Sequence, residues 1–182
     1  MPAQPRLIVV GGFAGAGKST LAKNIGRALS LPVFEIDQMA RSIQDNKDFQ
    51  GAPQAAYRIA FDLFFSFAHG HLQNEGSLIL DQNMGHRQTW QNIVTLKTSL
   101  PHIEVVIFLL DCPYDLCVSR VAARTKHPNL LEVTPENLHD HKYKWDFLHD
   151  NELPEAIRID ATRPATAVFQ EVMHFLNPKI AP

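Results

Sequence analysis

The chain has 182 residues, a formal net charge of −2 and an apolar fraction of 45%. These values suit one globular domain over residues 1–182 with a full core, and they exclude the global basic character typical of nucleic-acid-binding proteins, although a local basic groove stays open. Two cysteines are too few for a disulfide framework, and no apolar run resembles a secretory leader or a membrane span, so we expect a cytoplasmic protein with no membrane partner.

The first predicted elements are an apolar strand over 7–10, a glycine-rich loop and a helix over 20–29. The loop fits the phosphate-binding pattern G-x-x-x-x-G-K-[ST], and its residues are Gly12, Phe13, Ala14, Gly15, Ala16, Gly17, Lys18 and Ser19. Glycines let backbone N–H groups approach phosphate oxygens, and the positive end of the helix dipole adds to that field. We therefore expect the loop and Thr20 to bind a nucleoside triphosphate, with Lys18 on the β- and γ-phosphates and Ser19 on Mg²⁺.

Four further apolar runs, at 32–36, 77–80, 105–110 and 156–159, predict strands, and a helical region runs through 57–68. Because the runs are continuous rather than alternating, the strands should be buried on both faces of a parallel sheet. The sequence thus predicts an α/β sandwich whose ligands bind at the carboxyl ends of the strands. The aromatic helix is typical of core, although it could also wall a substrate pocket.

Each of these four strands ends at an aspartate, namely Asp37, Asp81, Asp111 or Asp160. Aspartate commonly caps helices and forms turns, and we interpret Asp111 and Asp160 in that way. Asp37 and Asp81 follow the strands that should flank the first one, so they should face the phosphate site. For these two we favour a functional role.

Residues 12–29 and 31–37 resemble the small P-loop kinases of metabolites and nucleotides, the group that contains shikimate, gluconate and adenylate kinases. The later segments resemble more closely the branch of zeta toxins, chloramphenicol phosphotransferases and polynucleotide kinases, with the similarity at 76–81, 120–124 and 133–138. The resemblance, to P-loop kinases with an AAA-type ATPase core, implies a five-stranded sheet of order 2-3-1-4-5 and a helical lid at about 124–140. It also implies ATP- and Mg²⁺-dependent transfer of the γ-phosphoryl group to a hydroxyl.

In these kinases a carboxylate at the position of Asp37 orients or deprotonates the attacking hydroxyl, so Asp37 is the predicted general base. Glu35 should point to the same side of an extended segment and either join the Mg²⁺ shell or hold a neighbouring lysine. Asp81 matches the acidic position that contacts the Mg²⁺ shell, with helix capping as the alternative.

Arg120 and Arg124 lie four residues apart and should share one helix face beside the predicted lid. The resemblance implies that Arg120 stacks on adenine and that Arg124 contacts the phosphates during transfer. A guanidinium suits both tasks, whereas surface ion pairing is the alternative. The pair Arg163 and Pro164 resembles the position that covers the other adenine face.

The acceptor side is less defined, and either Arg41 or Arg87 could hold an anionic group of the substrate. We expect the acceptor to be a hydroxyl-bearing small molecule. Two alternatives stay open: a kinase of a nucleic-acid 5′-hydroxyl or a nucleotide sugar, and a regulatory nucleotide-binding ATPase without an acceptor. Against the second stands Asp37, because a pure switch needs no acid there.

Overall fold

The computed structural model describes residues 4–123, 138 and 156–176. Within these residues all strand pairs are parallel and the sheet order is β2-β3-β1-β4-β5, which confirms the predicted fold and strand order. The strands are β1 (Arg6–Gly12), β2 (Val33–Glu35), β3 (Leu78–Asp81), β4 (Glu104–Asp111) and β5 (Ile157–Asp160). The helices are α1 (Lys18–Leu29), α2 (Ile36–Gln44), α3 (Pro53–Gln73), α4 (Arg87–Ser99), α5 (Tyr114–Ala122) and α7 (Ala165–Leu176).

The central strand β1 is apolar along its length because both of its faces are covered. Leu7, Ile8, Val9 and Val10 have no exposed surface, and β1 pairs with β3 on one side and with β4 on the other. Alternate residues of β1 belong to two separate apolar clusters, one on each face of the sheet. This explains why its sequence shows no alternation of polar and apolar residues.

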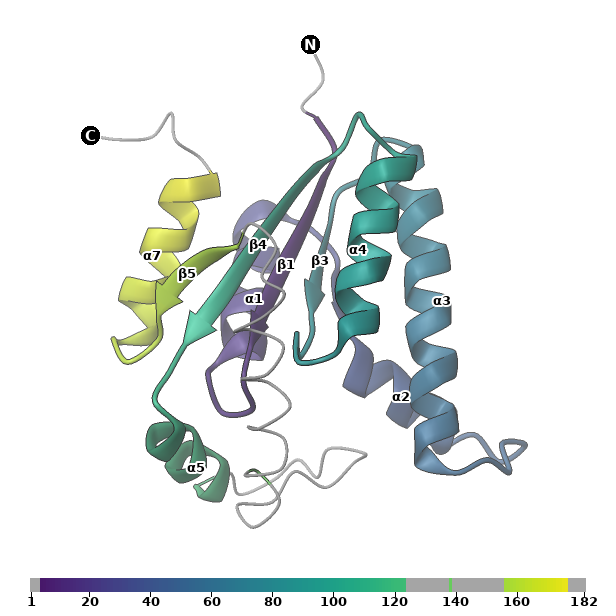
Figure 1. Ribbon diagram of the computed structural model, residues 1–182, viewed down its shortest axis with the longest axis horizontal. Helices are drawn as coiled ribbons and strands as arrows, with labels where there is room; N and C mark the ends of the chain where they lie inside the picture. Colours follow the sequence, from purple (N-terminus) through teal and green to yellow (C-terminus); the bar gives the residue numbers. More distant parts are fainter. Residues whose placement is uncertain (1–3, 124–137, 139–155, 177–182) are drawn as a thin grey trace.

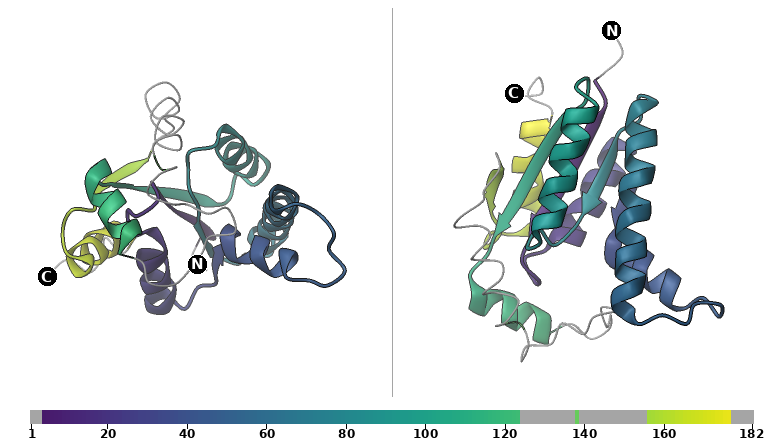
Figure 2. Two further views of the ribbon diagram at one scale, coloured as in Figure 1. Left: turned by 90° about the horizontal axis from the view of Figure 1, so that it is seen from below. Right: turned by 45° about the vertical axis from the view of Figure 1, so that its right-hand side comes forward.

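Helices cover the two faces of the sheet as separate layers (Figures 1 and 2). The cluster on one face joins the sheet to α2, α3 and α4, while the cluster on the other joins it to α1, α5 and α7. The carboxyl ends of the strands meet at one edge, where the loop after β1 and the starts of α2 and α4 also lie. This edge is where parallel α/β sheets bind ligands.

Helix α2 begins one residue earlier than the aspartate that the sequence assigned to the end of a strand. Ile36 and Ala40 lie one turn apart and are both buried, so the helical conformation places two apolar side chains in the core. Strand β2 therefore ends at Glu35, and Asp37 lies in the first turn of α2. A carboxylate in this position is stabilised by the positive end of the helix dipole.

The aromatic helix α3 contributes mainly to the core. Phe64 has no exposed surface and Phe65 is nearly buried, whereas Phe67 is about half exposed on the outer side.

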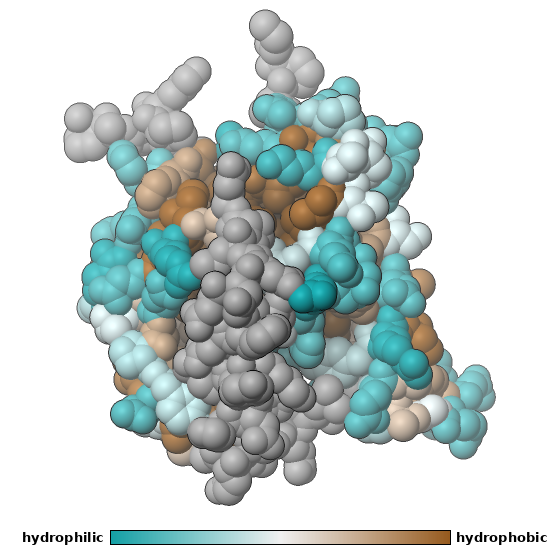
Figure 3. Space-filling model, in the orientation of Figure 1, coloured by the Kyte–Doolittle hydropathy of each residue, from teal (hydrophilic) through white to brown (hydrophobic). Residues whose placement is uncertain are grey.

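Hydrophilic residues cover much of the described surface of the outer helices in Figure 3, with apolar residues visible between α7 and α4. Among the described residues, no helix has the length and apolar character needed to span a membrane.

Candidate active site

The loop between β1 and α1 has the backbone conformation that its glycines permit. Gly15 and Gly17 have φ values of 92° and 102°, in the left-handed region that favours glycine. A Cβ atom on Gly15 would also come within 2.5 Å of the Cys117 carbonyl oxygen, so the loop packs tightly on α5. Helix α1 has no side-chain N-cap, which leaves its first N–H groups available to an anion.

Lys18 and Ser19 open α1 directly above this loop. The Lys18 ammonium donates a hydrogen bond to the Phe13 carbonyl at 3.2 Å, so the side chain folds back over the loop. The Ser19 hydroxyl donates to the Asp81 carboxylate. The phosphate loop and the acidic end of β3 are thus in direct contact, and a shared Mg²⁺ site at this point stays a prediction.

Asp81 is a buried acid, with only 6% of its surface exposed. Burial raises its pKa to about 6; Lys18 and the Ser19 hydrogen bond oppose this shift, and the negative charges of Glu35 and Asp37 add to it. Asp81 is the last residue of β3, and in the sheet register it pairs with Glu35 of β2 and with Val10 of β1. It therefore faces the phosphate loop and caps no helix.

The oxygen atoms of Ser19 and Asp81 are suitable ligands for Mg²⁺, but they are too few for a metal ion that is bound by protein ligands alone. One hydroxyl and one carboxylate are typical of a Mg²⁺ ion that takes its other ligands from phosphates and water. Within 4–123, 138 and 156–176, no group of three histidine, cysteine or acidic residues could hold a metal alone. Glu35 forms an ion pair with Lys23 at 2.9 Å, which corresponds to the lysine-holding alternative of the sequence analysis.

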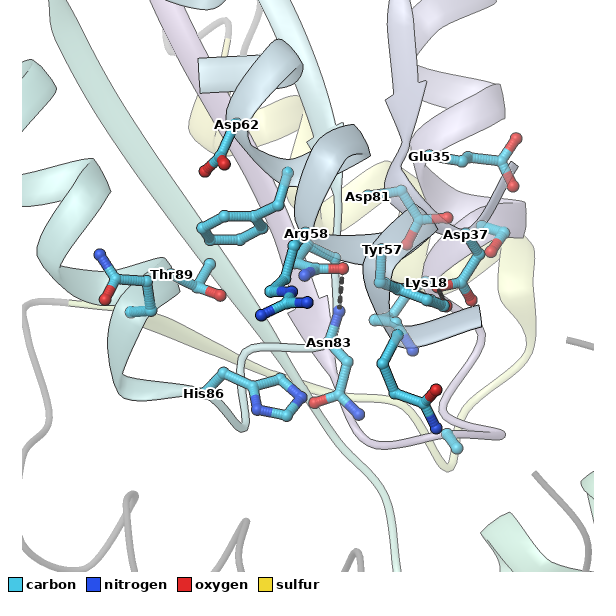
Figure 4. Close-up of a pocket in the computed structure, with 16 residues that line it drawn as sticks. Lys18, Glu35, Asp37, Tyr57, Arg58, Asp62, Asp81, Asn83, His86 and Thr89 are labelled. Atoms are coloured by element: carbon cyan, nitrogen blue, oxygen red, sulfur yellow. Dashed lines mark hydrogen bonds between the residues drawn. The ribbon is translucent and has the colours of Figure 1, made fainter. Parts of the chain in front are cut away.

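A cavity of about 590 Å³ opens beside the phosphate loop. Its first wall comes from the loop and the acidic strand ends, and it is lined by Ala14, Lys18, Ser19, Glu35, Asp37 and Asp81. Helix α3 supplies a second wall, with Gln54, Tyr57, Arg58, Phe61 and Asp62. Figure 4 shows Lys18, Asp37 and Asp81 at one end of this space, and Thr89 and His86 at the other.

Asp37 is held in this cavity by a tyrosine of α3. The Tyr57 hydroxyl donates a hydrogen bond to Asp37 Oδ1. Burial raises the Tyr57 pKa well above its usual range, and the neighbouring Asp37 charge raises it further, while Arg41 acts in the opposite direction. The phenol therefore stays protonated and keeps donating to the carboxylate.

The two arginines predicted for the acceptor do not line the cavity. Arg41 is half-buried on α2 and influences Tyr57 electrostatically, while Arg87 is exposed at the start of α4. Arg58 lines the cavity instead, and sequence reasoning missed it. A usable signal was the polar series Gln54, Arg58 and Asp62, which recurs every four residues through an apolar helix.

Arg120, one of the residues predicted to contact the nucleotide, joins α5 to the loop after β5. Its guanidinium donates to the Ala161 carbonyl at 3.1 Å and to the Cys112 sulfur at 3.4 Å. In that loop Arg163 pairs with Asp160 and Glu171, and Pro164 is exposed just before α7. Arg124 and the predicted lid at 124–140, apart from residue 138, lie outside the described residues.

The remaining two strand-end acids have local structural roles. Asp160 accepts hydrogen bonds from the Thr162 backbone N–H and hydroxyl, which matches the turn-forming role expected of it. Asp111 instead pairs with Arg158 on the adjacent strand at 3.0 Å. Because Pro113 is the N-cap of α5, Asp111 does not cap that helix.

The sequence profile of the AAA_33 family, an AAA domain, matches residues 7–148. No curated protein matches the chain closely. Among solved structures, a candidate kinase from Chloroflexus aurantiacus is 20% identical with a TM-score of 0.70, over 96% of this chain and 97% of that one. A sugar kinase from Janibacter sp. is 18% identical with a TM-score of 0.68, over 95% of both chains. The shikimate kinase of Acinetobacter baumannii, in complex with shikimate, is 19% identical with a TM-score of 0.67, over 99% of this chain and 97% of that one.

Proposed function

This chain belongs to the AAA_33 family, and from that premise we propose that it is a kinase that transfers the γ-phosphoryl group of ATP to a hydroxyl of a small molecule. The structural neighbours include kinases of small polar metabolites, which supports this class of reaction. We also propose that the chain is related to the zeta-toxin, chloramphenicol-phosphotransferase and polynucleotide-kinase branch, which rests on the residue patterns at 76–81, 120–124 and 133–138.

The observation that carries the proposal is the shared cavity of Asp37 and Lys18. A nucleotide switch needs the phosphate loop and Asp81, but it has no use for a second acid in a space large enough for another molecule. A kinase needs this arrangement, because acceptor and phosphate must meet in line within one site.

In this reaction the acceptor oxygen forms a bond to the γ-phosphorus as the bond to the bridging oxygen of ADP breaks. The acceptor hydroxyl proton passes to Asp37, whose carboxylate also orients the oxygen. Lys18 and the N–H groups at the start of α1 bind the phosphate oxygens and stabilise the charge that develops on them.

Ser19 and Asp81 would hold Mg²⁺, which neutralises phosphate charge when bound. Because Asp81 has a pKa of about 6, its carboxylate is mostly ionised at neutral pH and able to serve as a ligand or to accept from a metal-bound water. On the nucleotide side we propose Arg120, Arg163 and Pro164 as adenine contacts, and Arg124 as a phosphate contact.

On the acceptor side, Arg58 replaces Arg41 and Arg87 as the residue that we propose contacts the substrate directly. Arg58 lines the cavity on α3, whereas Arg41 does not line it and acts electrostatically on Tyr57. We propose Arg41 as a residue that supports the Tyr57 and Asp37 pair, and we assign Arg87 no contact with the substrate.

The test compares Lys18→Ala and Asp37→Asn with the wild type in ATP binding and in acceptor phosphorylation. We expect Asp37→Asn to keep ATP affinity within about twofold and to lose about 10²- to 10⁴-fold in kcat, because it removes only the base. Lys18→Ala should lose transfer altogether. If Asp37→Asn phosphorylates its acceptor at the wild-type rate, the proposed base is wrong.

A further inference from the structure

One buried hydroxyl on the cavity wall has no hydrogen-bond partner. Thr89 has no exposed surface, and its Oγ1 atom makes no hydrogen bond within the described part of the chain. Buried polar side chains in native proteins are nearly always paired, so a specific exception calls for an explanation. Thr89 also lines the cavity that contains Lys18 and Asp37.

Thr89 lies in the first turn of α4, and Gly85, four residues earlier, precedes the helix, so the Thr89 hydroxyl lacks the intrahelical carbonyl that threonines further along α4 use. Thr95 and Thr98 on the exposed side of α4 donate to the carbonyl groups four residues earlier, at 2.9 Å and 2.8 Å. Thr89 makes no such bond, although its backbone N–H donates to His86. The Thr89 hydroxyl therefore donates to no helix carbonyl. Figure 4 shows the Thr89 side chain on the α4 wall, at the end of the cavity that is remote from Lys18.

The cavity around Thr89 has the composition of a site for a small polar molecule. Polar groups predominate on the β3–α4 wall, where Gln82, Asn83, His86 and Gln88 line the space. Phe61 gives an apolar surface on the α3 wall, and Arg58 stands between the two ends in Figure 4. Such a mixture suits a molecule with several hydroxyls and one less polar face.

We propose that the acceptor is a polyhydroxylated molecule of the sugar or polyol class, and that Thr89 binds one of its hydroxyls that does not react. The reacting hydroxyl lies at Asp37, and a second hydroxyl reaches Thr89 once the threonine side chain rotates toward it. Thr89 is thus a specificity residue: it fixes which hydroxyl faces the phosphate. This inference rests on the proposed kinase function and adds to it the substrate class.

The proposal makes opposite predictions for stability and for activity. In the acceptor-free protein, Thr89→Val replaces an unpaired hydroxyl with a methyl group of the same shape, so the Tm should rise by about 2–4 °C. Activity should fall, because the acceptor hydroxyl then lies unpaired beside an apolar group, and kcat/KM should drop by about 10- to 100-fold.

The experiment uses labelled ATP with D-gluconate, shikimate, D-mannitol and myo-inositol as polyol probes, and with cyclohexanol and nucleosides as comparison acceptors. Wild type, Thr89→Val and Thr89→Ser are measured together with Thr95→Val, the control on the exposed side of α4. We expect a polyol to be the best acceptor, Thr89→Ser to retain most activity, and Thr95→Val to equal the wild type. The KM for ATP should stay the same in all four proteins.

The outcomes separate this inference from the proposed function. If Thr89→Val equals the wild type on the best acceptor, or if cyclohexanol or a nucleoside is preferred, the inference fails while the kinase assignment stands. A Tm that falls in Thr89→Val also overturns it, because the hydroxyl would then have a structural partner. If no acceptor of any class takes up label, the proposed function itself fails.

Discussion

Replacing Asp81 by asparagine should stabilise the protein while it disables the metal site. The acid is buried with a pKa of about 6, against an ordinary value of 3.8. Each pKa unit corresponds to 1.36 kcal/mol, so the folded state carries a cost of about 3 kcal/mol when this carboxyl is ionised. Asparagine has nearly the same shape and no charge, and it removes that cost.

The sign of the pH dependence follows from the raised pKa. The folded carboxyl binds its proton more tightly than the unfolded one, so acidification from about pH 7 to pH 5 favours the folded wild type. The advantage of Asp81→Asn should be about 3 kcal/mol at pH 8, shrink as the pH falls below about 6, and vanish below about pH 3, where the carboxyl is protonated in both the folded and the unfolded state. At pH 8 this corresponds to a Tm increase of about 6–12 °C.

The assay is thermal and denaturant unfolding in EDTA, without nucleotide, over a pH series. Asp62→Asn is the matched control, because that acid also lines the cavity but is exposed. Its stability difference from the wild type should be small at every pH. The reasoning is refuted if Asp81→Asn is no more stable than the wild type at pH 8, or if its advantage does not change with pH.

The remaining predictions concern the two ends of the site. Tyr57→Phe removes the hydrogen bond that fixes Asp37, and we expect kcat to fall about 10-fold while the KM for ATP stays the same; an equal loss in ATP binding would show that the phenol supports the nucleotide site instead. Arg120→Met keeps much of the side-chain volume but loses the contacts to Ala161 and any stacking on adenine. We expect ATP affinity to fall about 10-fold by calorimetry, and unchanged affinity would remove Arg120 from the nucleotide site.

The sequence was most informative where local pattern and physics agree. Glycines 12, 15 and 17 have positive φ values, and the apolar run before them and the helix-forming stretch after them predicted the buried strand β1 and the helix α1. Continuous apolar strands then required a parallel sheet with covered faces. The contact between Ser19 and Asp81 follows from two parallel strands that end at one edge.

The acceptor side could not be read in the same way, because it depends on how helices pack. Whether Arg41, Arg58 or Arg87 faces the cavity is decided by the rotation of α2, α3 and α4 about their axes, which no local pattern fixes. Strand β2 also ends one residue earlier than predicted, at Glu35, because the burial of Ile36 and Ala40 favours a helix that begins at Ile36. Arg124 and most of the predicted lid lie outside the described residues and stay predictions.

The most direct test of the account follows the label of γ-labelled ATP during turnover by the wild-type protein, with the polyol probes present and Mg²⁺ in excess. The account predicts that the label appears on a hydroxyl of the acceptor, in a one-to-one ratio with the ADP formed, and that Asp37→Asn nearly abolishes this transfer. Label found only in inorganic phosphate, at a rate that no acceptor changes, would contradict it and would identify a nucleotide hydrolase instead.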